Sequence, residues 1–129
     1  MFKLGDRLNI DKFTYIDILW PCSNLIHENV LNNNSIVCKV NYKDVSILFT
    51  GDIEEIAERS ILEVYGSRNV LKADILKVAH HGSKSSSIME FLAEVKPQIA
   101  LIGVGKNNKF GHPNEGVLER LEGLRCGDL

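Results

Sequence analysis

The sequence has few of the features that would assign it to a special class of protein. Its 129 residues include three cysteines, none of them in a CxxC spacing, which disfavours a disulfide framework or a zinc knuckle. No apolar run approaches the roughly 20 residues that a membrane helix needs. The start, MFKLGDRLNI, lacks the basic and then apolar layout of a signal peptide. A net charge of −2 disfavours a domain whose whole surface binds nucleic acid.

The composition is typical of one soluble globular domain over residues 1–129, with 44% hydrophobic and 25% charged residues. The charges are unevenly distributed along the chain. Residues 52–63 contain five acids and one arginine, whereas residues 71–113 contain six lysines and three acids. The second stretch is therefore suited to attract an anion locally.

The first third of the chain favours strands. β-branched and aromatic residues predict short strands over residues 5–10 and 13–20. Residues 22–34 are polar and rich in asparagine, which predicts a loop with one helical turn near residues 25–31. The segments SIVCKV and VSILFT, separated by residues 41–44, predict a β-hairpin.

The rest of the chain alternates between helix and strand patterns. The predicted order is an amphipathic helix over 53–64, a buried strand in ADILKVAHHGS, a helix over 87–95 that the serine cluster caps, a buried strand over 98–104 and a helix over 114–121. Such alternation is typical of a layered α/β fold.

Three loops follow the carboxyl ends of predicted strands. They read TGDIEE at 50–55, AHHGSK at 79–84 and a glycine-asparagine loop ending in GHP at 111–113. In layered α/β folds such strand ends form the edge where ligands bind. The side chains there that suit zinc or manganese are Asp52, His80, His81 and His112. Ser83, with backbone amides at a helix start, is suited to hold a phosphate oxygen.

Each of these signals also has a simpler structural interpretation. Asp52 stands where it would cap a helix that begins at Ile53. The histidine pair before Gly82 is compatible with a surface turn, and His112 with a place beside the last helix. The asparagines at 32–34 are common turn formers. From each motif taken singly, these alternatives stay open.

Taken together, the motifs resemble a known family. The matching segments, in order, are NNNSIV at 32–37, LFTGD at 48–52, LKADILKVAHHGSKSS at 71–86 and the stretch from Lys96 through GHP. They resemble the metallo-β-lactamase-fold domain of ComEC-type DNA internalisation competence proteins over residues 13–122. The combination of NNxS, TGD, HHGS and GHP is specific to this branch, whereas HHGS alone is not.

The resemblance implies an α/β fold of the metallo-β-lactamase type, an αββα sandwich of two half-domains with metals where the two sheets meet. Family members carry a motif of the form HxDxDH in the amino-terminal half, and residues 1–129 contain none. The chain therefore resembles the carboxyl-terminal half, hairpin strands followed by βαβα, truncated at both ends. We expect two divalent ions, zinc or manganese, in the full domain and few or none in this fragment.

The resemblance also assigns site residues. Asp52 matches the metal-bridging aspartate, and His80 matches a late histidine ligand. His81 then faces the substrate or supports the ligand, although the two histidines can exchange roles. Asn34 matches a position where related enzymes place another histidine, and an amide is the poorer zinc ligand, so we expect weaker or manganese-like binding there. The positions expected on the phosphate side, together with Asn34, are Ser83, Lys84 and His112.

The implied activity of the full domain is metal-dependent hydrolysis of a DNA phosphodiester during DNA uptake. The implied partners are DNA, the missing amino-terminal half-domain and a membrane channel domain. The implied location is the extracytoplasmic face of a bacterial membrane. Alone, the fragment is expected to have little or no activity.

Three other interpretations remain. The first is a stand-alone hydrolase of another phosphodiester with the same fold, and the second is a non-catalytic scaffold module. The third is a homodimer formed through the exposed sheet edge. Membrane spans elsewhere in the coding sequence would disfavour the first, and a lack of both metal and activity in a longer protein would favour the second.

Overall fold

The computed structural model describes residues 6–21, 26–66, 68–103 and 113–125. Strands and helices alternate in the second half of the chain, as the sequence pattern predicts. The elements are β1 (Arg7–Asp11), β2 (Thr14–Trp20), α1 (Val30–Asn33), β3 (Val37–Tyr42), β4 (Val45–Phe49), α2 (Glu55–Tyr65), β5 (Ile75–Lys77), the 3₁₀ turn η1 (Ala79–Gly82), α3 (Met89–Val95), β6 (Ile99–Leu101) and α4 (Glu115–Arg125).

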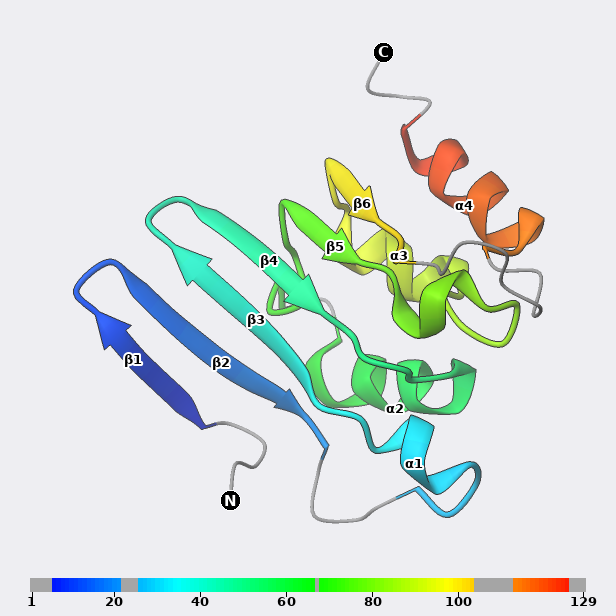
Figure 1. Cartoon of the computed structure of the whole chain (residues 1–129), viewed down its shortest axis with the longest axis horizontal. Helices are drawn as coiled ribbons and strands as arrows, with labels where there is room; N and C mark the ends of the chain where they lie inside the picture. Colours follow the sequence, from blue (N-terminus) through cyan, green and yellow to red (C-terminus); the bar gives the residue numbers. More distant parts are fainter. Residues whose placement is uncertain (1–5, 22–25, 67, 104–112, 126–129) are drawn as a thin grey trace.

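The described strands form one six-stranded sheet whose spatial order follows the chain, from β1 to β6 (Figure 1). Neighbouring strands from β1 to β4 are antiparallel. The last three, β4, β5 and β6, are parallel. The mixed α/β class is therefore confirmed. Because parallel strands end at the same edge, the loops after β4, β5 and β6 begin side by side.

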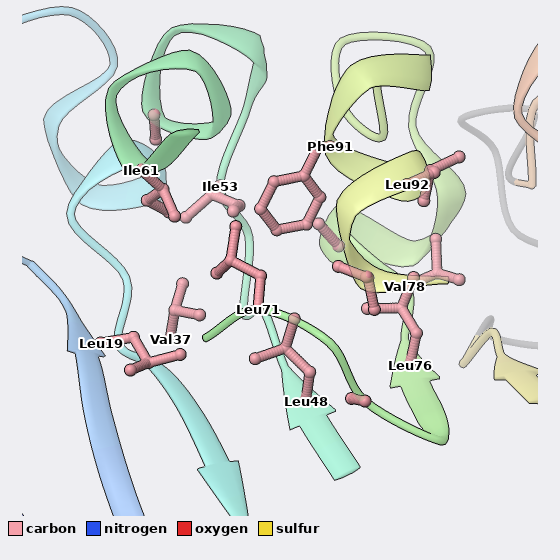
Figure 2. Packing of buried hydrophobic residues seen from close by; sticks show 14 of the residues in the cluster. Leu19, Val37, Leu48, Ile53, Ile61, Leu71, Leu76, Val78, Phe91 and Leu92 are labelled. Atoms are coloured by element: carbon pink, nitrogen blue, oxygen red, sulfur yellow. The ribbon is translucent and has the colours of Figure 1, made fainter. Parts of the chain in front are cut away.

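The hydrophobic core lies between one face of the sheet and helices α2 and α3 (Figure 2). Leu48 of β4 and Leu76 of β5 point into it and are 0% and 1% exposed. Ile61 and Phe91 meet them from the helix side and are equally buried. This packing fixes the ends of β4 and β5 with respect to the two helices that follow them.

The opposite face of the sheet is also apolar. The strand register aligns one side chain from each strand in a continuous row: Leu8, Ile16, Val40, Ile47, Ile75 and Ile99. A parallel row contains Phe49, Lys77 and Leu101, and Phe49 and Leu101 are 40% and 50% exposed. Within the described residues this second face is therefore partly open to solvent.

The expectation that the last strand is buried on both sides is wrong. The strand is shorter than predicted, Ile99–Leu101, and lies at the edge of the sheet. Ile99 is 51% exposed, because it points to the open face. An apolar run shows that both faces suit burial, but it does not show which face the chain itself covers.

Several predicted boundaries also shift. The helical turn lies at Val30–Asn33 rather than near residues 25–31. The hairpin turn contains only the residues between Tyr42 and Val45, and Lys43 adopts a left-handed backbone with φ 50°. A tight two-residue hairpin turn requires such positive φ values. The first long helix begins at Glu55 rather than at Ile53.

We predict that the two faces of β4 contribute unequally to stability. Leu48→Ala should lower the free energy of unfolding by about 3 kcal/mol, because it leaves a cavity in the core. Phe49→Ala on the same strand is the matched control and should cost no more than about 1 kcal/mol, since its ring is already partly hydrated. Urea unfolding of both variants measures the difference. Equal losses would contradict an open second face.

Candidate functional site

The loops that follow β4 and β5 are joined by hydrogen bonds. The backbone N–H of His80 donates to the carbonyl of Gly51 at 2.9 Å. Thr50, the residue before Gly51, is buried, and its hydroxyl donates to the carbonyl of Lys77 at 2.6 Å. Asp52 and His80 therefore lie on neighbouring loops at the same edge of the sheet.

Gly51 allows the TGD loop to pack against the asparagine-rich segment. Its φ is +56°, and a Cβ atom there would lie 2.7 Å from Cβ of Ser35. The hydroxyl of Ser35 accepts the backbone N–H of Asp52 at 3.3 Å. The motifs NNNS and TGD, 17 positions apart in this contact, thus form one joined corner.

Gly82 plays the same role between the HHGS motif and the start of α4. Its φ is +80°, and a Cβ atom there would lie 2.7 Å from Cβ of Pro113. The carbonyl of Gly82 accepts the N–H of Asn114 at 2.8 Å. The end of the GHP motif therefore lies against the histidine turn. His112 itself lies outside the described residues, so its assignment to the phosphate side stays a prediction.

Both histidines adopt left-handed backbone conformations, with φ 52° for His80 and 55° for His81. For a residue with a Cβ atom this conformation costs roughly 1–2 kcal/mol. Such strain persists only where surrounding contacts determine it, and it is common at functional sites. The strain at both histidines therefore makes the HHGS turn a candidate site.

The two imidazoles use the same ring nitrogen for protein contacts. The Nδ1 atom of His80 is buried and lies 3.8 Å from Oε2 of Glu54. Nδ1 of His81 lies 2.5 Å from the carbonyl oxygen of Gly103, and since a carbonyl only accepts, Nδ1 donates. Nε2 is then the nitrogen of each ring that suits a cation. The possible exchange of roles between the two histidines stays open.

Glu54 is the residue that sequence reasoning missed. Its Oε1 accepts from the amides of Asn29 at 2.8 Å and Asn33 at 3.2 Å, and its Oε2 accepts from the hydroxyl of Ser85 at 2.9 Å. Burial raises the pKa of Glu54, but these hydrogen bonds and the neighbouring His80 outweigh burial and lower the pKa below its usual value. The sequence signal was an acid two positions after TGD, opposite a run of asparagines.

The asparagines brace the corner rather than forming a simple turn. Asn33 is fully buried, and its Oδ1 accepts the N–H of Glu54 at 2.9 Å. The amide of Asn34 pairs with the backbone of Ile26 at 3.0 and 2.9 Å and donates to the carbonyl of Val30 at 2.8 Å. The structure thus gives Asn34 a bracing role, and its assignment to the substrate side stays a prediction.

The interpretation of Asp52 as a helix cap is wrong. Helix α2 begins at Glu55, and its N-cap position is Glu54, which makes no side-chain cap bond. Asp52 lies in the turn before this position.

The serine cluster does not cap α3 as predicted. The N-cap position is Ile88, and the carboxylate of Glu58 accepts the N–H groups of Ser87 at 2.6 Å and Ile88 at 3.0 Å. Arg120 of α4 donates to the Ser87 carbonyl at 2.7 Å. One side chain from α2 and one from α4 therefore hold this segment.

Ser83 and Lys84 differ in their exposure to solvent. Ser83 is buried, and its hydroxyl lies 3.0 Å from that of Ser85, so it is engaged within the loop. Lys84 is exposed beside it. Their assignment to a phosphate group stays a prediction.

Asp52 and His80 are side chains of the type that binds a divalent ion, but two ligands are too few for a complete site. Carboxylate and imidazole are donors that zinc and manganese accept. In the part of the chain that the structure describes, however, no three or more His, Cys, Asp or Glu side chains cluster as a metal site would require. A complete site would therefore need ligands from outside the described residues.

None of the helices in residues 6–21, 26–66, 68–103 and 113–125 combines the length and the apolar character needed to cross a membrane.

Comparison with known proteins relates the chain to competence proteins. No protein-family model matches it. It is 41% identical to "ComE operon protein 3" of Bacillus subtilis over 91 residues, and the aligned region covers 70% of this chain and 11% of that protein. It is 38% identical over 90 residues to "Recombination protein 2" of Haemophilus influenzae, covering 70% and 11%. It is 36% identical over 90 residues to "Competence protein ComA" of Neisseria gonorrhoeae, covering 70% and 13%.

These matches confirm the resemblance to ComEC-type competence proteins. The chain spans only about a tenth of the length of these relatives, between 11% and 13%.

Gly51 provides a direct test of the joined corner. Gly51→Ala should lower the free energy of unfolding by about 2 kcal/mol or more, because the new methyl group meets Ser35 in a left-handed backbone. Gly123→Ala within α4 is the matched control, since its Cβ would meet only a side-chain atom at 4.0 Å. It should stabilise by up to about 1 kcal/mol. Urea unfolding distinguishes the two, and a neutral Gly51→Ala would contradict the packing.

The raised pKa of Glu58 predicts that the stability of the fold depends on pH. Burial raises its pKa from 4.5 to about 7, although Ser87, Ile88 and Arg120 oppose the shift. Between pH 4.5 and about 7, Glu58 keeps its proton in the folded chain and has lost it in the unfolded chain. The free energy of unfolding therefore falls as pH rises. Relative to Glu58→Gln, the wild type should lose about 3 kcal/mol across this window.

Chemical denaturation of both proteins from pH 4.5 to 8 measures this difference, because other titrating groups cancel in the comparison. Glu63→Gln, on the exposed side of the same helix, is the control and should follow the wild-type curve. Parallel curves for the wild type and Glu58→Gln would contradict a raised pKa in the fold.

Proposed function

We propose that the chain is part of a metal-dependent phosphodiesterase that cleaves DNA during its uptake. The observation that carries the proposal is the hydrogen bond between Gly51 and His80, which holds the loops of Asp52 and His80 together at the carboxyl edge of parallel strands. This edge is where α/β folds bind ligands. Support also comes from relatives whose names describe competence and recombination.

The proposal extends to the fold, a metallo-β-lactamase-like αββα sandwich. The open sheet face supports it, since Phe49, Ile99 and Leu101 are 40–51% exposed on a largely apolar surface. A surface of this kind is suited to a second sheet packed face to face. An amino-terminal half-domain would cover it and would bring the remaining metal ligands to the edge.

The residues at this edge have distinct proposed tasks. Asp52 and His80 would hold the cation side, with Nε2 of His80 directed outward. Bound zinc or manganese would supply charge stabilisation at phosphorus and a more acidic water. Lys84, which is exposed, would attract the phosphate backbone. His81, whose Nδ1 is engaged by Gly103, would present Nε2 to the substrate.

The proposed setting is the one that the resemblance to ComEC-type competence proteins implies. The phosphodiesterase would act as an extracytoplasmic domain of a bacterial membrane protein, next to a channel domain that carries the other DNA strand. DNA is thus the proposed substrate and partner.

The test uses the full-length protein that contains this chain, assayed for cleavage of single-stranded and duplex DNA with added Mn²⁺ or Zn²⁺. Asp52→Asn and His80→Ala should each reduce cleavage at least about 100-fold, the scale on which removal of a catalytic group acts. Asp44→Asn, an exposed acid in the hairpin turn, is the charge-matched control and should retain activity.

Cleavage that persists in Asp52→Asn and His80→Ala would show that these residues are not the site. A wild-type protein that binds neither metal and cleaves no phosphodiester would favour the scaffold module instead. Hydrolysis of small phosphodiesters without DNA cleavage would favour a hydrolase of another substrate.

A further inference from the structure

We propose that Glu54 is a positioning residue for His80, which holds the imidazole with Nδ1 directed inward and Nε2 toward the edge of the sheet. The inference deepens the proposed function, because its consequence for metal binding depends on His80 being a ligand. The orientation itself does not depend on the metal.

The carboxylate of Glu54 is fixed from several directions. Asn29 and Asn33 donate to Oε1 from the segment around α1, at 2.8 and 3.2 Å. Ser85 donates to Oε2 from the loop after η1, at 2.9 Å. Asn33 also binds the backbone N–H of Glu54. Two segments therefore determine the position of this one carboxylate, which a residue serving only solubility would not require.

The imidazole of His80 faces this fixed carboxylate. Nδ1 lies 3.8 Å from Oε2, longer than a hydrogen bond but close enough for electrostatic orientation. Nδ1 is buried, while the whole side chain is 23% exposed, so solvent reaches other atoms of the side chain. A carboxylate accepts and does not donate, so it favours the tautomer with hydrogen on Nδ1. That tautomer leaves the lone pair on Nε2.

The backbone of His80 is held independently. Its N–H donates to the carbonyl of Gly51 at 2.9 Å. His80 lies within the turn η1 (Ala79–Gly82), where its backbone has a left-handed φ of 52°. The freedom that remains is rotation of the side chain. Glu54 faces Nδ1 across 3.8 Å and so limits that rotation on the buried side of the ring.

The imidazole of His81 has a neutral partner in place of the carboxylate that faces His80. Its Nδ1 donates to the backbone carbonyl of Gly103, a neutral acceptor, and its side chain is exposed. A carboxylate partner makes an imidazole a more basic metal ligand than a carbonyl does. The contrast favours His80 as the stronger ligand of the pair.

The experiment measures the His80 tautomer in the metal-free chain by long-range ¹H–¹⁵N NMR at alkaline pH, where imidazoles are neutral. The wild type should show hydrogen mainly on Nδ1. Glu54→Gln, which keeps the shape but removes the charge, should shift the population toward Nε2–H. Glu55→Gln removes a charge one residue away and should leave the tautomer unchanged. A wild-type Nε2–H tautomer, or no response to Glu54→Gln, would overturn the inference without any variant having to unfold.

A second arm adds Mn²⁺ alone to the full-length protein that contains this chain, where the remaining ligands are expected, and follows paramagnetic broadening of the signals of Asp52 and His80. Broadening in the wild type that requires at least about 10-fold more Mn²⁺ in Glu54→Gln supports the inference, since outer partners of a ligating histidine act on this scale. Equal broadening in both proteins counts against it. A lack of broadening at both residues in the wild type contradicts the proposed function, while the tautomer still decides the role of Glu54.

Discussion

The hydrogen bond from His80 N–H to the carbonyl of Gly51 is the constraint on which the candidate site depends. It joins two loops that are distant in sequence but begin at the same sheet edge, because β4 and β5 are parallel neighbours. The bonds from Thr50 to Lys77 and from Ser85 to Glu54 join the same two loops on either side of it. With these bonds, a movement of either loop displaces the other, so the corner behaves as one unit.

The glycines and the strained histidines follow from that constraint. Gly51 must approach Ser35, and Gly82 must approach Pro113, more closely than a Cβ atom allows. The left-handed conformations of His80 and His81 cost free energy locally. Contacts with Gly51, Glu54 and Gly103 offset this cost. Glycine or asparagine would adopt these conformations at a lower cost.

The sequence was a good guide to elements and a poor guide to the contacts between them. The strands, the α/β alternation and the loops at one edge follow from periodicity and turn residues, which are local properties. The bracing of Glu54 by Asn33, and of Ser87 by Glu58, joins residues 21 and 29 positions apart. No local pattern encodes such pairs. The exposure of Ile99 was missed for a related reason, since an apolar strand can belong to a face that another part of a protein covers.

Amide hydrogen exchange of His80 in the folded chain tests the central claim most directly. If the bond to Gly51 joins the two loops, the His80 amide should exchange slowly and with the same opening free energy as the buried amides of β4 and β5. Exchange at the rate of an unprotected loop amide would show that the two loops open separately, and the joined corner would not exist.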